Sequence, residues 1–514
     1  MERREVLLLA KELYDENQLA ELTHAINFAT EKHLGQKRLS GKPYIVHPLA
    51  VARLLIEWGM DIDTVLAGIL HDTVEDTDAT LDEIESLFGH DVAFLVDGVT
   101  KVSQARSGMQ DLGNYLPQTK DNLSKLLIAV SQDVRVIIIK LADRLHNLQT
   151  LKYMPTDKQQ KIARESLEVF APMADRLGMG RVRMEIEELA FRYLDPSEFD
   201  RLKNIIRKRL GKSTRKLGAV RTDVERELKK QGIEFEINGR VKSVYSLHKK
   251  LEKVDGNIDD IYDLMALRII VPNNETCYRV LGILHGMYQP MLARIKDYIA
   301  IPKPNGYQSL HTTVITPSKQ IVEFQIRTNE MHEYAERGLA ASFHYHEQKS
   351  SKNYARKKSS HLPAELQWIT QMQEVAARLK DGEEISQDQL NVDLFGNRIF
   401  VYSPKGDIYN LPEGALPLDF AYLVHSDIGK HSYSFRVNGR IHAFDKPLHN
   451  GDVVEVITRK LSQPKSDWLE LVTTSHARAK LRMQLRKLGL LQAVSGAAAI
   501  IRDKAARKKG KARK

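Results

Sequence analysis

The sequence predicts a multidomain protein: an all-α block first, an α/β block with a mixed sheet next, then a small β-rich block and a helical C-terminus. Three observations predict this order. Apolar residues recur at helical spacing through the first 195 residues, alternating runs at 310–316 and 321–327 predict a β-hairpin, and short β runs begin near residue 393. A length of 514 residues allows about three domains of ~150 residues.

Composition excludes several classes of protein. No apolar run approaches the ~20 residues of a membrane helix, and the N-terminus carries charges on both sides of its leucine run, unlike a signal peptide. Cys277 is the only cysteine, which rules out an intrachain disulfide and a Cys-rich zinc site. We therefore expect a cytoplasmic protein without a membrane partner.

The net charge of +10 is concentrated at one end. Residues 502–514 hold eight Lys or Arg and one Asp, so seven of the ten net charges lie in the last thirteen residues. This segment is predicted to be a solvated tail, and contact with RNA or the ribosome is the alternative.

Helical periodicity organises the first block. It predicts helices at 22–34, 48–58, 62–70 and 81–88. Residues 134–139 have strand propensity, but the stripe continues through Leu141, Leu145 and Leu148, which predicts a buried helix. The Gly-, Ser- and Gln-rich stretch 103–118 is predicted to be a mobile loop.

Two imidazoles and two carboxylates of this block form a mixed N/O ligand set suited to a divalent first-row metal such as Mn²⁺. They are His47, His71, Asp72 and Asp143. Each of three polar residues follows one member by four positions, and on a helix such pairs share a face. These are Glu75, Asp76 and Asn147. The alternative is a set of ordinary core histidines with capping carboxylates.

The stretch 294–328 combines a charged triplet, a Pro- and Gly-rich loop and the hairpin. In the second strand Glu323, Gln325 and Arg327 point to one side because strand side chains alternate. Alternation alone favours a solvated sheet face. The alternative is the floor of a charged pocket.

A charged helical connector is predicted at 197–232, followed by a strand at 234–238. The basic stretch 239–243 then opens a helix that ends near 253, where backbone N–H groups would favour phosphate. Asp263 precedes an apolar strand at 264–271 and could share Mg²⁺ with Glu323. An N-cap aspartate and a surface glutamate are the alternative.

Beyond residue 349 we expect a linker, a helix at 362–380, and β runs at 399–402 and 407–411 joined by a turn. A helix at 417–424, strands at 434–437 and 453–457, and one helix at 468–492 complete the chain.

Several segments resemble the RelA/SpoT homologue family, whose members make guanosine tetra- and pentaphosphate. RIKDYIA, PKPNGYQSLHT and VEFQIRT resemble its synthetase core. KRLSGKPYIVHPLAVA, GILHDTVEDT and KLADRLHNLQTL resemble its hydrolase domain, and the order H…HD…D resembles the HD phosphohydrolase superfamily. The resemblance implies an HD-type hydrolase domain at 1–195, a nucleotidyltransferase-like synthetase domain at 196–348, a linker and helix at 349–390, a β-grasp TGS domain at 391–460, and a helix and basic tail at 461–514. It also implies a short form without the zinc-finger and ACT regions of long relatives.

The resemblance implies roles for the hydrolase residues. Mn²⁺ would be bound by His47, His71, Asp72 and Asp143, and Glu75 and Asp76 would assist the attacking water. The nucleotide pocket would be lined by Arg38, Ser40, Tyr44, Asn147 and Thr150.

In the synthetase domain, Asp263 and Glu323 would bind Mg²⁺, and Glu323 would also activate the 3′-hydroxyl of GDP or GTP. Tyr307 would stack on guanine. The contacts to ATP would come from Arg240, Lys242, Ser246 and Lys250, and the acceptor nucleotide would be held by Lys296, Lys303, Asn305 and His311. Arg268, Gln325 and Arg327 would complete the site.

Some positions depart from the family pattern. Residues 340–346 read AASFHYH, with Ser342, Phe343 and His346 where the family has His, Trp and Lys. Val241 replaces a usual Pro, and Ala293 a usual Gly. None of these removes a metal ligand.

The resulting hypothesis is a cytoplasmic bifunctional enzyme that makes (p)ppGpp from ATP and GDP or GTP and hydrolyses it. One alternative is a hydrolase with a degenerate synthetase. Another is a ribosome- or RNA-binding regulator acting through the TGS domain and tail; His431 lies where a tRNA contact could fall, and an ordinary surface histidine is the favoured interpretation of that residue.

Overall fold

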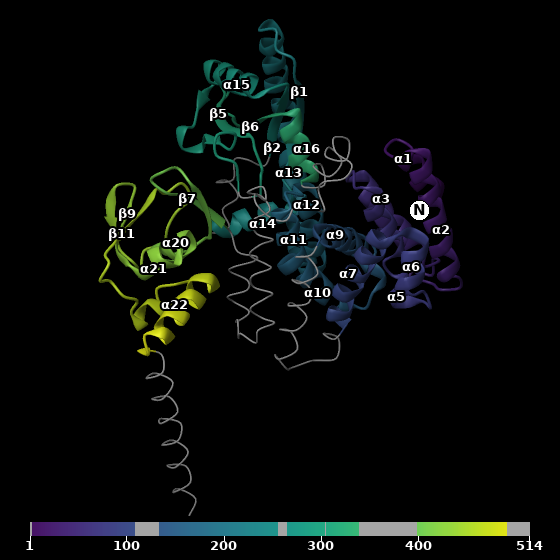
Figure 1. Cartoon of the computed structure of the whole chain (residues 1–514). Helices are drawn as coiled ribbons and strands as arrows, with labels where there is room; N and C mark the ends of the chain where they lie inside the picture. Colours follow the sequence, from purple (N-terminus) through teal and green to yellow (C-terminus); the bar gives the residue numbers. More distant parts are fainter. Residues whose placement is uncertain (1–2, 108–132, 255–264, 304, 339–397, 491–514) are drawn as a thin grey trace, which may run out of the picture. The chain divides into compact units, whose positions relative to one another are not determined.

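The computed structural model describes residues 3–107, 133–254, 265–303, 305–338 and 398–490. The chain divides into two compact units, Met1–Ala377 and Arg378–Lys514 (Figure 1). No helix within the described ranges is long and apolar enough to cross a membrane.

The first part of unit 1 is helical, as the periodicity predicts (Figure 1). Its helical segments are α1 (Arg3–Ala10), α2 (Glu16–Lys32), α3 (Val46–Glu57), α4 (Ile62–Leu70), α5 (Thr73–Asp76), α6 (Leu81–Phe88), α7 (His90–Ser107), α9 (Val134–Gln149), η1 (Leu151–Tyr153), α10 (Thr156–Glu165), the π-helical turn η2 (Ser166–Phe170), α11 (Ala171–Arg176) and α12 (Gly180–Leu194).

Helix α9 is the central element of this block. It contacts α3, α4, α7 and α12, and Ile137, Ile138 and Ile139 are each fully buried. The prediction of a buried helix at 134–139 is therefore confirmed, since a helix surrounded by neighbours can be apolar on all sides.

Two local predictions in this block are wrong. Helix α7 runs to Ser107, so residues 103–107 are helical and not loop, consistent with the helix propensity of Gln, Ala and Arg; residues 108–118 lie outside the described ranges. Helix α4 ends at Leu70, so His71 and Glu75 do not share one continuous helix. His71 contacts the carbonyl of Gly68 through Nδ1, and Thr73 donates to the carbonyl of Leu70, which satisfies backbone groups at this helix end.

The second part of unit 1 is built on a mixed sheet of order β1-β2-β6-β5-β3, with β4 also paired to β5. Strands β2 and β6 are parallel, and the other pairs are antiparallel. The strands are β1 (Glu236–Val241), β2 (Met265–Val271), β3 (Gln289–Pro290), β4 (Lys296–Asp297), β5 (Leu310–Ile315) and β6 (Ile321–Thr328). The predicted hairpin is β5–β6, with Lys319 at φ 58° in its turn.

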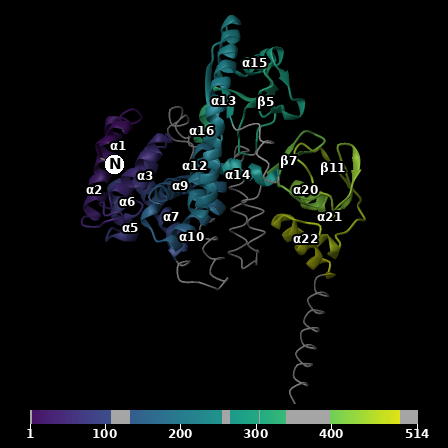
Figure 2. The ribbon, with the colours of Figure 1, turned by 180° about the vertical axis from the view of Figure 1, so that it is seen from behind.

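The helices of this part are α13 (Pro196–Lys230), α14 (Val244–Lys253), α15 (Asn274–Met287), η4 (Leu292–Arg294) and α16 (Asn329–Arg337). Figure 2 shows α13 as one continuous helix, which confirms the predicted connector. Residues of α13 and α15 pack with Val322, Phe324 and Ile326 in one apolar cluster on one face of the sheet.

The opposite face carries the polar side chains, and the prediction that it is solvated is wrong. Gln325 is 6% exposed and Arg327 is 1% exposed. Helix α16 packs against β2 and β6 and contributes Glu336 as a partner of Arg327, so this part of the face is buried and charged.

Strand β1 extends further than predicted. It runs to Val241, and Arg240 pairs with Ala266 of β2. The basic stretch 239–243 is therefore mainly the end of a strand and not the start of a helix, because ladder hydrogen bonds with β2 hold it extended. Helix α14 begins at Val244 and is capped by the hydroxyl of Ser243.

Close backbone packing at Gly338 and a side-chain hydrogen bond from Asn305 join the helical block to the sheet block. A Cβ added at Gly338, which has φ +61°, would lie 2.2 Å from the carbonyl oxygen of Leu177 and 2.6 Å from Gly178 C. The side chain of Asn305 donates to the carbonyl of Asp175 at 3.0 Å, and Tyr334 donates to the carbonyl of Asn305 at 3.2 Å. We call residues 175–180 with Asn305, Gly306 and Gly338 the glycine junction.

Unit 2 is a small β-rich body with helices. It contains β7 (Arg398–Tyr402), β8 (Ile408–Pro412), α20 (Pro417–Val424), α21 (Ser426–Lys430), β9 (Ser432–Val437), β10 (Arg440–His442), β11 (Val454–Thr458), η7 (Ser466–Leu469) and α22 (Ser475–Lys487). Strands β7 and β8 form a hairpin, and the second sheet has the order β10-β9-β11. The predicted helix at 362–380 lies outside the described residues.

The prediction of one helix at 468–492 is wrong. Trp468 lies in η7, and α22 starts only at Ser475. Asp419, which is 1% exposed, accepts hydrogen bonds from the amides and hydroxyls of Thr473 and Thr474. These bonds keep the backbone between η7 and α22 from forming a helix. Thr474 then caps the N-terminus of α22.

Candidate active sites

The helical block brings three predicted ligands to one point. His47 lies in the first turn of α3, His71 directly follows α4, and Asp143 lies in the middle of α9. One ligand atom from each lies within 4.8 Å of the others, and all three residues are buried. Asp72 adds a fourth, with Oδ2 3.5 Å from His47 Nε2 and Oδ1 3.0 Å from His71 Nε2.

The donor set fits a divalent cation. His71 contacts the Gly68 carbonyl through Nδ1 at 2.8 Å, so that nitrogen carries a proton, and in the neutral imidazole Nε2 keeps its lone pair. Burial lowers the pKa of His71, but the charge of Asp72 raises it overall, so a cation at Nε2 would take the place of a second proton. That Nε2 is buried and has no hydrogen-bond partner among the described residues. A buried nitrogen lone pair next to two carboxylates would be unfavourable without a cation. The cluster can therefore hold a divalent metal.

Electrostatics keep the carboxylates ionised. Burial alone would raise the pKa of Asp143, but the positive charge of Lys140 and the hydrogen bond with His47 lower it well below its usual value. The pKa of Asp72 is also lowered, because attraction to His71 and His47 outweighs burial. Burial lowers the pKa of His47, which favours the neutral imidazole that a metal requires.

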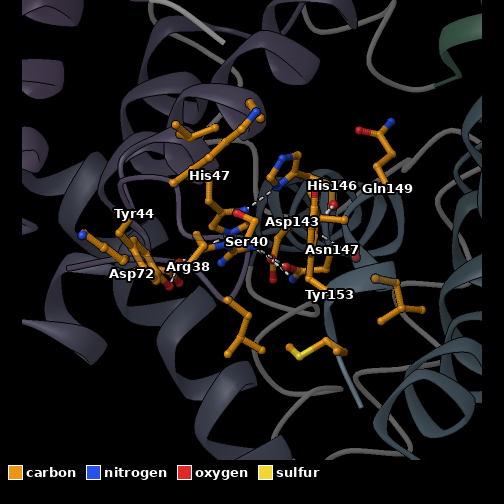
Figure 3. Close-up of a pocket in the computed structure, with 18 of the residues that line it drawn as sticks. Arg38, Ser40, Tyr44, His47, Asp72, Asp143, His146, Asn147, Gln149 and Tyr153 are labelled. Carbon is orange, nitrogen blue, oxygen red and sulfur yellow. Dashed lines mark hydrogen bonds and ion pairs between the residues drawn. The ribbon is translucent and has the colours of Figure 1, made fainter. Parts of the chain in front are cut away.

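A cavity of about 670 Å³ opens onto this cluster (Figure 3), within the range of about 300–1,000 Å³ typical of small-molecule sites. All the predicted hydrolase residues except His71 line it: Arg38, Ser40, Tyr44, His47, Asp72, Glu75, Asp76, Asp143, Asn147 and Thr150. Cationic side chains that sequence reasoning did not select also line it: Lys37, Lys42, Arg53, Lys140 and Lys152. A cavity with metal ligands and many cations suits a phosphorylated anion.

Tyr44 connects two groups of predicted residues: the metal ligands, through Asp72, and the pair that would assist the attacking water, through Asp76. Its hydroxyl lies 2.8 Å from Asp72 Oδ2 and 2.7 Å from Asp76 Oδ2. One hydroxyl has one proton, so it donates to only one of these carboxylates at a time. Burial, followed by the charges of Asp72 and Asp76, raises the pKa of Tyr44, so the phenol keeps that proton.

Two further residues of α9 were missed. Lys140 donates to Asp143 Oδ2 at 3.0 Å, and His146 Nδ1 lies 2.7 Å from His47 Nδ1. They stand three residues before and three after Asp143. Helical spacing from a suspected ligand is the signal that could have found both.

The sheet face forms the second candidate site. Gln325 of β6 accepts from Arg240 at 3.2 Å and donates to Glu323 Oε1 at 3.0 Å. His311 of β5 lies opposite Gln325 in the ladder, with Nδ1 3.7 Å from Glu323 Oε1. Tyr307 OH lies 2.9 Å from His311 Nε2. Strands β1, β5 and β6 and one loop thus bring five of the predicted residues together.

Glu336 was not predicted and holds two arginines. Its Oε1 accepts from Arg268 at 3.1 Å and from Arg327 at 3.2 Å. Burial and the charge of Arg268 lower the pKa of Arg327 to about 10. Glu336 lies on α16, nine residues after Arg327, and the sequence analysis assigned it no role.

The Pro-rich loop supplies more cations to this face. Lys303 Nζ lies 4.8 Å from the Tyr298 ring centre and 5.0 Å from that of Tyr307, and burial lowers its pKa. Lys296 of β4 pairs with His311. Asn305, predicted to hold a nucleotide, donates to the carbonyl of Asp175 in the glycine junction, and its nucleotide contact stays a prediction.

The remaining predicted residues lie on other segments or outside the described ranges. Lys242 lies between β1 and α14, and Ser246 and Lys250 lie on α14, where Ser246 bonds to Ser243. Asp263 and residues 340–346 lie outside the described ranges, so the Asp263–Glu323 pair remains a prediction. In unit 2, His431 is half-buried, with Nδ1 3.0 Å from the Ser462 carbonyl.

Three family models match the chain in order. They are the HD domain at residues 25–180, the region found in RelA / SpoT proteins at 239–350, and the TGS domain at 399–458. A GTP pyrophosphokinase of Myxococcus xanthus is 44% identical over 455 residues, 88% of this chain and 59% of that protein. The chain belongs to the RelA/SpoT family.

Two further relatives are similar to most of this chain. The bifunctional (p)ppGpp synthase/hydrolase SpoT of Escherichia coli is 40% identical over 92% of this chain and 66% of its own length. A probable guanosine-3′,5′-bis(diphosphate) 3′-pyrophosphohydrolase of Synechocystis is 41% identical over 91% of this chain and 60% of its own. The chain thus spans about 60–66% of these relatives' lengths. The segment that matches the HD domain contains His47, His71, Asp72 and Asp143. The segment that matches the region found in RelA / SpoT proteins contains the charged sheet face.

Proposed function

We propose that this chain is a bifunctional enzyme that makes and destroys (p)ppGpp. One site would transfer pyrophosphate from ATP to the 3′-hydroxyl of GDP or GTP, and the other would release that pyrophosphate by hydrolysis. The observation that carries the proposal is the convergence of His47, His71 and Asp143 on one point at the wall of a cation-lined cavity of about 670 Å³.

In the hydrolase, His47, His71, Asp72 and Asp143 would hold Mn²⁺. The ion would supply Lewis-acid activation of water and of the phosphate. Glu75 and Asp76 line the same cavity and would accept the proton of the attacking water. Arg38 would bind the nucleotide; it is held by Asn147 at 2.9 Å and lies 5.3 Å from the Tyr44 ring centre.

In the synthetase, Glu323 would accept the proton of the 3′-hydroxyl and, with Asp263, hold Mg²⁺. Arg240, Lys296, Lys303 and the pair Arg268–Arg327 would offset the charge of the phosphates. Phosphoryl transfer depends mainly on positioning and charge stabilisation, and this face is dense in both cations and hydrogen bonds. Tyr307 would stack on guanine, with His311 orienting its hydroxyl.

The TGS domain and the basic tail would serve recognition. We propose that they contact tRNA or the ribosome in the cytoplasm, supported by the TGS match at 399–458 and by the charge of residues 502–514.

A nucleotide assay tests the proposal. The Glu75→Ala/Asp76→Ala variant, given labelled ATP with GDP or GTP and Mg²⁺, should accumulate labelled (p)ppGpp, and the unmodified chain with Mn²⁺ should release pyrophosphate from it. Hydrolysis without any synthesis would leave only the hydrolase. Absence of both would contradict the proposal.

A further inference from the structure

Two buried histidines meet at the metal cluster through the same ring atom. His47 Nδ1 and His146 Nδ1 lie 2.7 Å apart, and the residues are 1% and 8% exposed (Figure 3). One comes from α3 and the other from α9, 99 residues apart in the sequence. At this distance the two nitrogens share one hydrogen bond.

Only one of the two nitrogens can carry the shared proton. The other ring nitrogen of His47, Nε2, faces Asp143 Oδ1 at 3.3 Å and Asp72 Oδ2 at 3.5 Å. To bind a cation there, Nε2 must keep its lone pair, so the His47 proton must sit on Nδ1. His146 Nδ1 is then the acceptor, and the His146 proton sits on Nε2.

His71 shows the same arrangement with a different acceptor. Its Nδ1 is held by the carbonyl of Gly68, which leaves Nε2 directed to the cluster. A backbone carbonyl is always an acceptor, and this fixes the tautomer of His71 by itself. The acceptor for His47 is a side chain and can be substituted.

We propose that His146 is a positioning residue that fixes the metal-binding tautomer and ring orientation of His47. The inference rests on the proposed metal-dependent hydrolase. Partners of this kind commonly change metal affinity or activity by about 10- to 100-fold when lost.

The test is a titration of the full chain with Mn²⁺ alone, following free Mn²⁺ by electron paramagnetic resonance. His146→Leu removes the acceptor, and His146→Gln restores one through its amide oxygen. His90→Leu, at an exposed histidine on α7 that contacts Glu85, controls for loss of an imidazole. We expect about 10- to 100-fold weaker binding for His146→Leu, recovery to within about fivefold for His146→Gln, and no change for His90→Leu.

The outcomes separate the inference from the proposed function. If the unmodified chain binds no Mn²⁺, both fail. If it binds Mn²⁺ and His146→Leu binds it equally well, only the inference fails.

A second measurement covers the possibility that His146→Leu does not fold. In the ¹⁵N-histidine-labelled chain loaded with Zn²⁺, the His146 Nδ1 resonance, assigned by its loss in His146→Gln, should be that of an unprotonated nitrogen. A protonated His146 Nδ1 would overturn the inference.

Discussion

The two candidate sites of unit 1 differ in how their charged groups are satisfied. In the helical site the ligand atoms converge, and His71 Nε2 has no hydrogen-bond partner among the described residues. On the sheet face the charged groups satisfy one another: Glu323 bonds to Gln325, and Glu336 bonds to both Arg268 and Arg327.

The difference concerns what each site needs from its ligand. The helical site brings ligand atoms of His47, His71 and Asp143 together, and a cation there would balance the charge of its carboxylates. On the sheet face Glu336 already holds Arg268 and Arg327 in position, and Nε of each arginine has no hydrogen-bond partner among the described residues. We therefore expect the first site to respond to metal and the second to substitutions of its internal partners.

The largest effect is expected from His71→Ala. This change removes a ligand from the helical site, so hydrolysis of guanosine tetraphosphate should fall by on the order of 10³-fold or more, because metal activation of water is lost. Pyrophosphate release measures it. Synthesis by the same variant should stay within about twofold, and a parallel loss of synthesis would contradict the independence of the two sites.

Glu336→Gln should affect the sheet face only. Hydrogen bonds to charged groups contribute about 1.5–3 kcal/mol, so weakening the hold on Arg268 and Arg327 should lower synthesis about 10- to 100-fold. The matched control is Glu333→Gln on the same helix, where the carboxylate is 54% exposed and pairs with Arg337. Equal losses in both variants would argue against a specific role for Glu336.

His311 should make the sheet face acid-sensitive. Burial, then the charges of Lys303, Lys296 and Arg240, lower its pKa to about 3 from 6.5. The folded state therefore binds fewer protons than the unfolded state between about pH 3 and 6.5, and stability falls as the pH is lowered through that window. Between pH 7 and 5 the free energy of unfolding of His311→Gln should fall by about 1–2 kcal/mol less than that of the unmodified chain, measured by urea unfolding. An unchanged pH dependence would contradict the buried, neutral imidazole.

The smallest effect is expected on communication between the sites. Two opposed activities in one chain would waste ATP, so nucleotide in one site should disfavour the active form of the other. Asp175 accepts from Arg183 at 2.8 Å and from Asn305 at 3.3 Å. Asp175→Ala should weaken, by about fivefold, the inhibition of hydrolysis by GDP plus an ATP analogue. Asp157→Ala, exposed on α10, is the control. Equal hydrolysis by the unmodified chain with and without these nucleotides would contradict the expected coupling between the two sites.

Much of the fold could be predicted from local pattern. Helices α4, α6 and α20 have the predicted bounds, because periodicity and turn residues lie within the segment itself. The break before α22 could not be predicted, since it depends on Asp419, more than fifty residues earlier. The burial of Arg327 was missed for a related reason: helix α16 must fold back over the strand before Glu336 can reach the arginine.

The candidate sites divide in the same way. Residue types and order selected the members of the metal cluster, and family resemblance selected most of the cavity lining. Lys140 and His146 could have been selected because each lies three residues from Asp143 on one helix, but neither belongs to a motif of its own. Asp175 could not have been linked to Asn305 from sequence, because 130 residues separate them.

The glycine junction limits how this chain can be divided for experiments. Gly338 has no room for a side chain where it meets residues 177–179, so the surface of the sheet block is shaped to the end of α11 and the start of α12. A fragment beginning at residue 196 would expose that surface to solvent and leave Asn305 without its acceptor. Exchanging the sheet block between relatives should therefore carry residues 175–180 along with it.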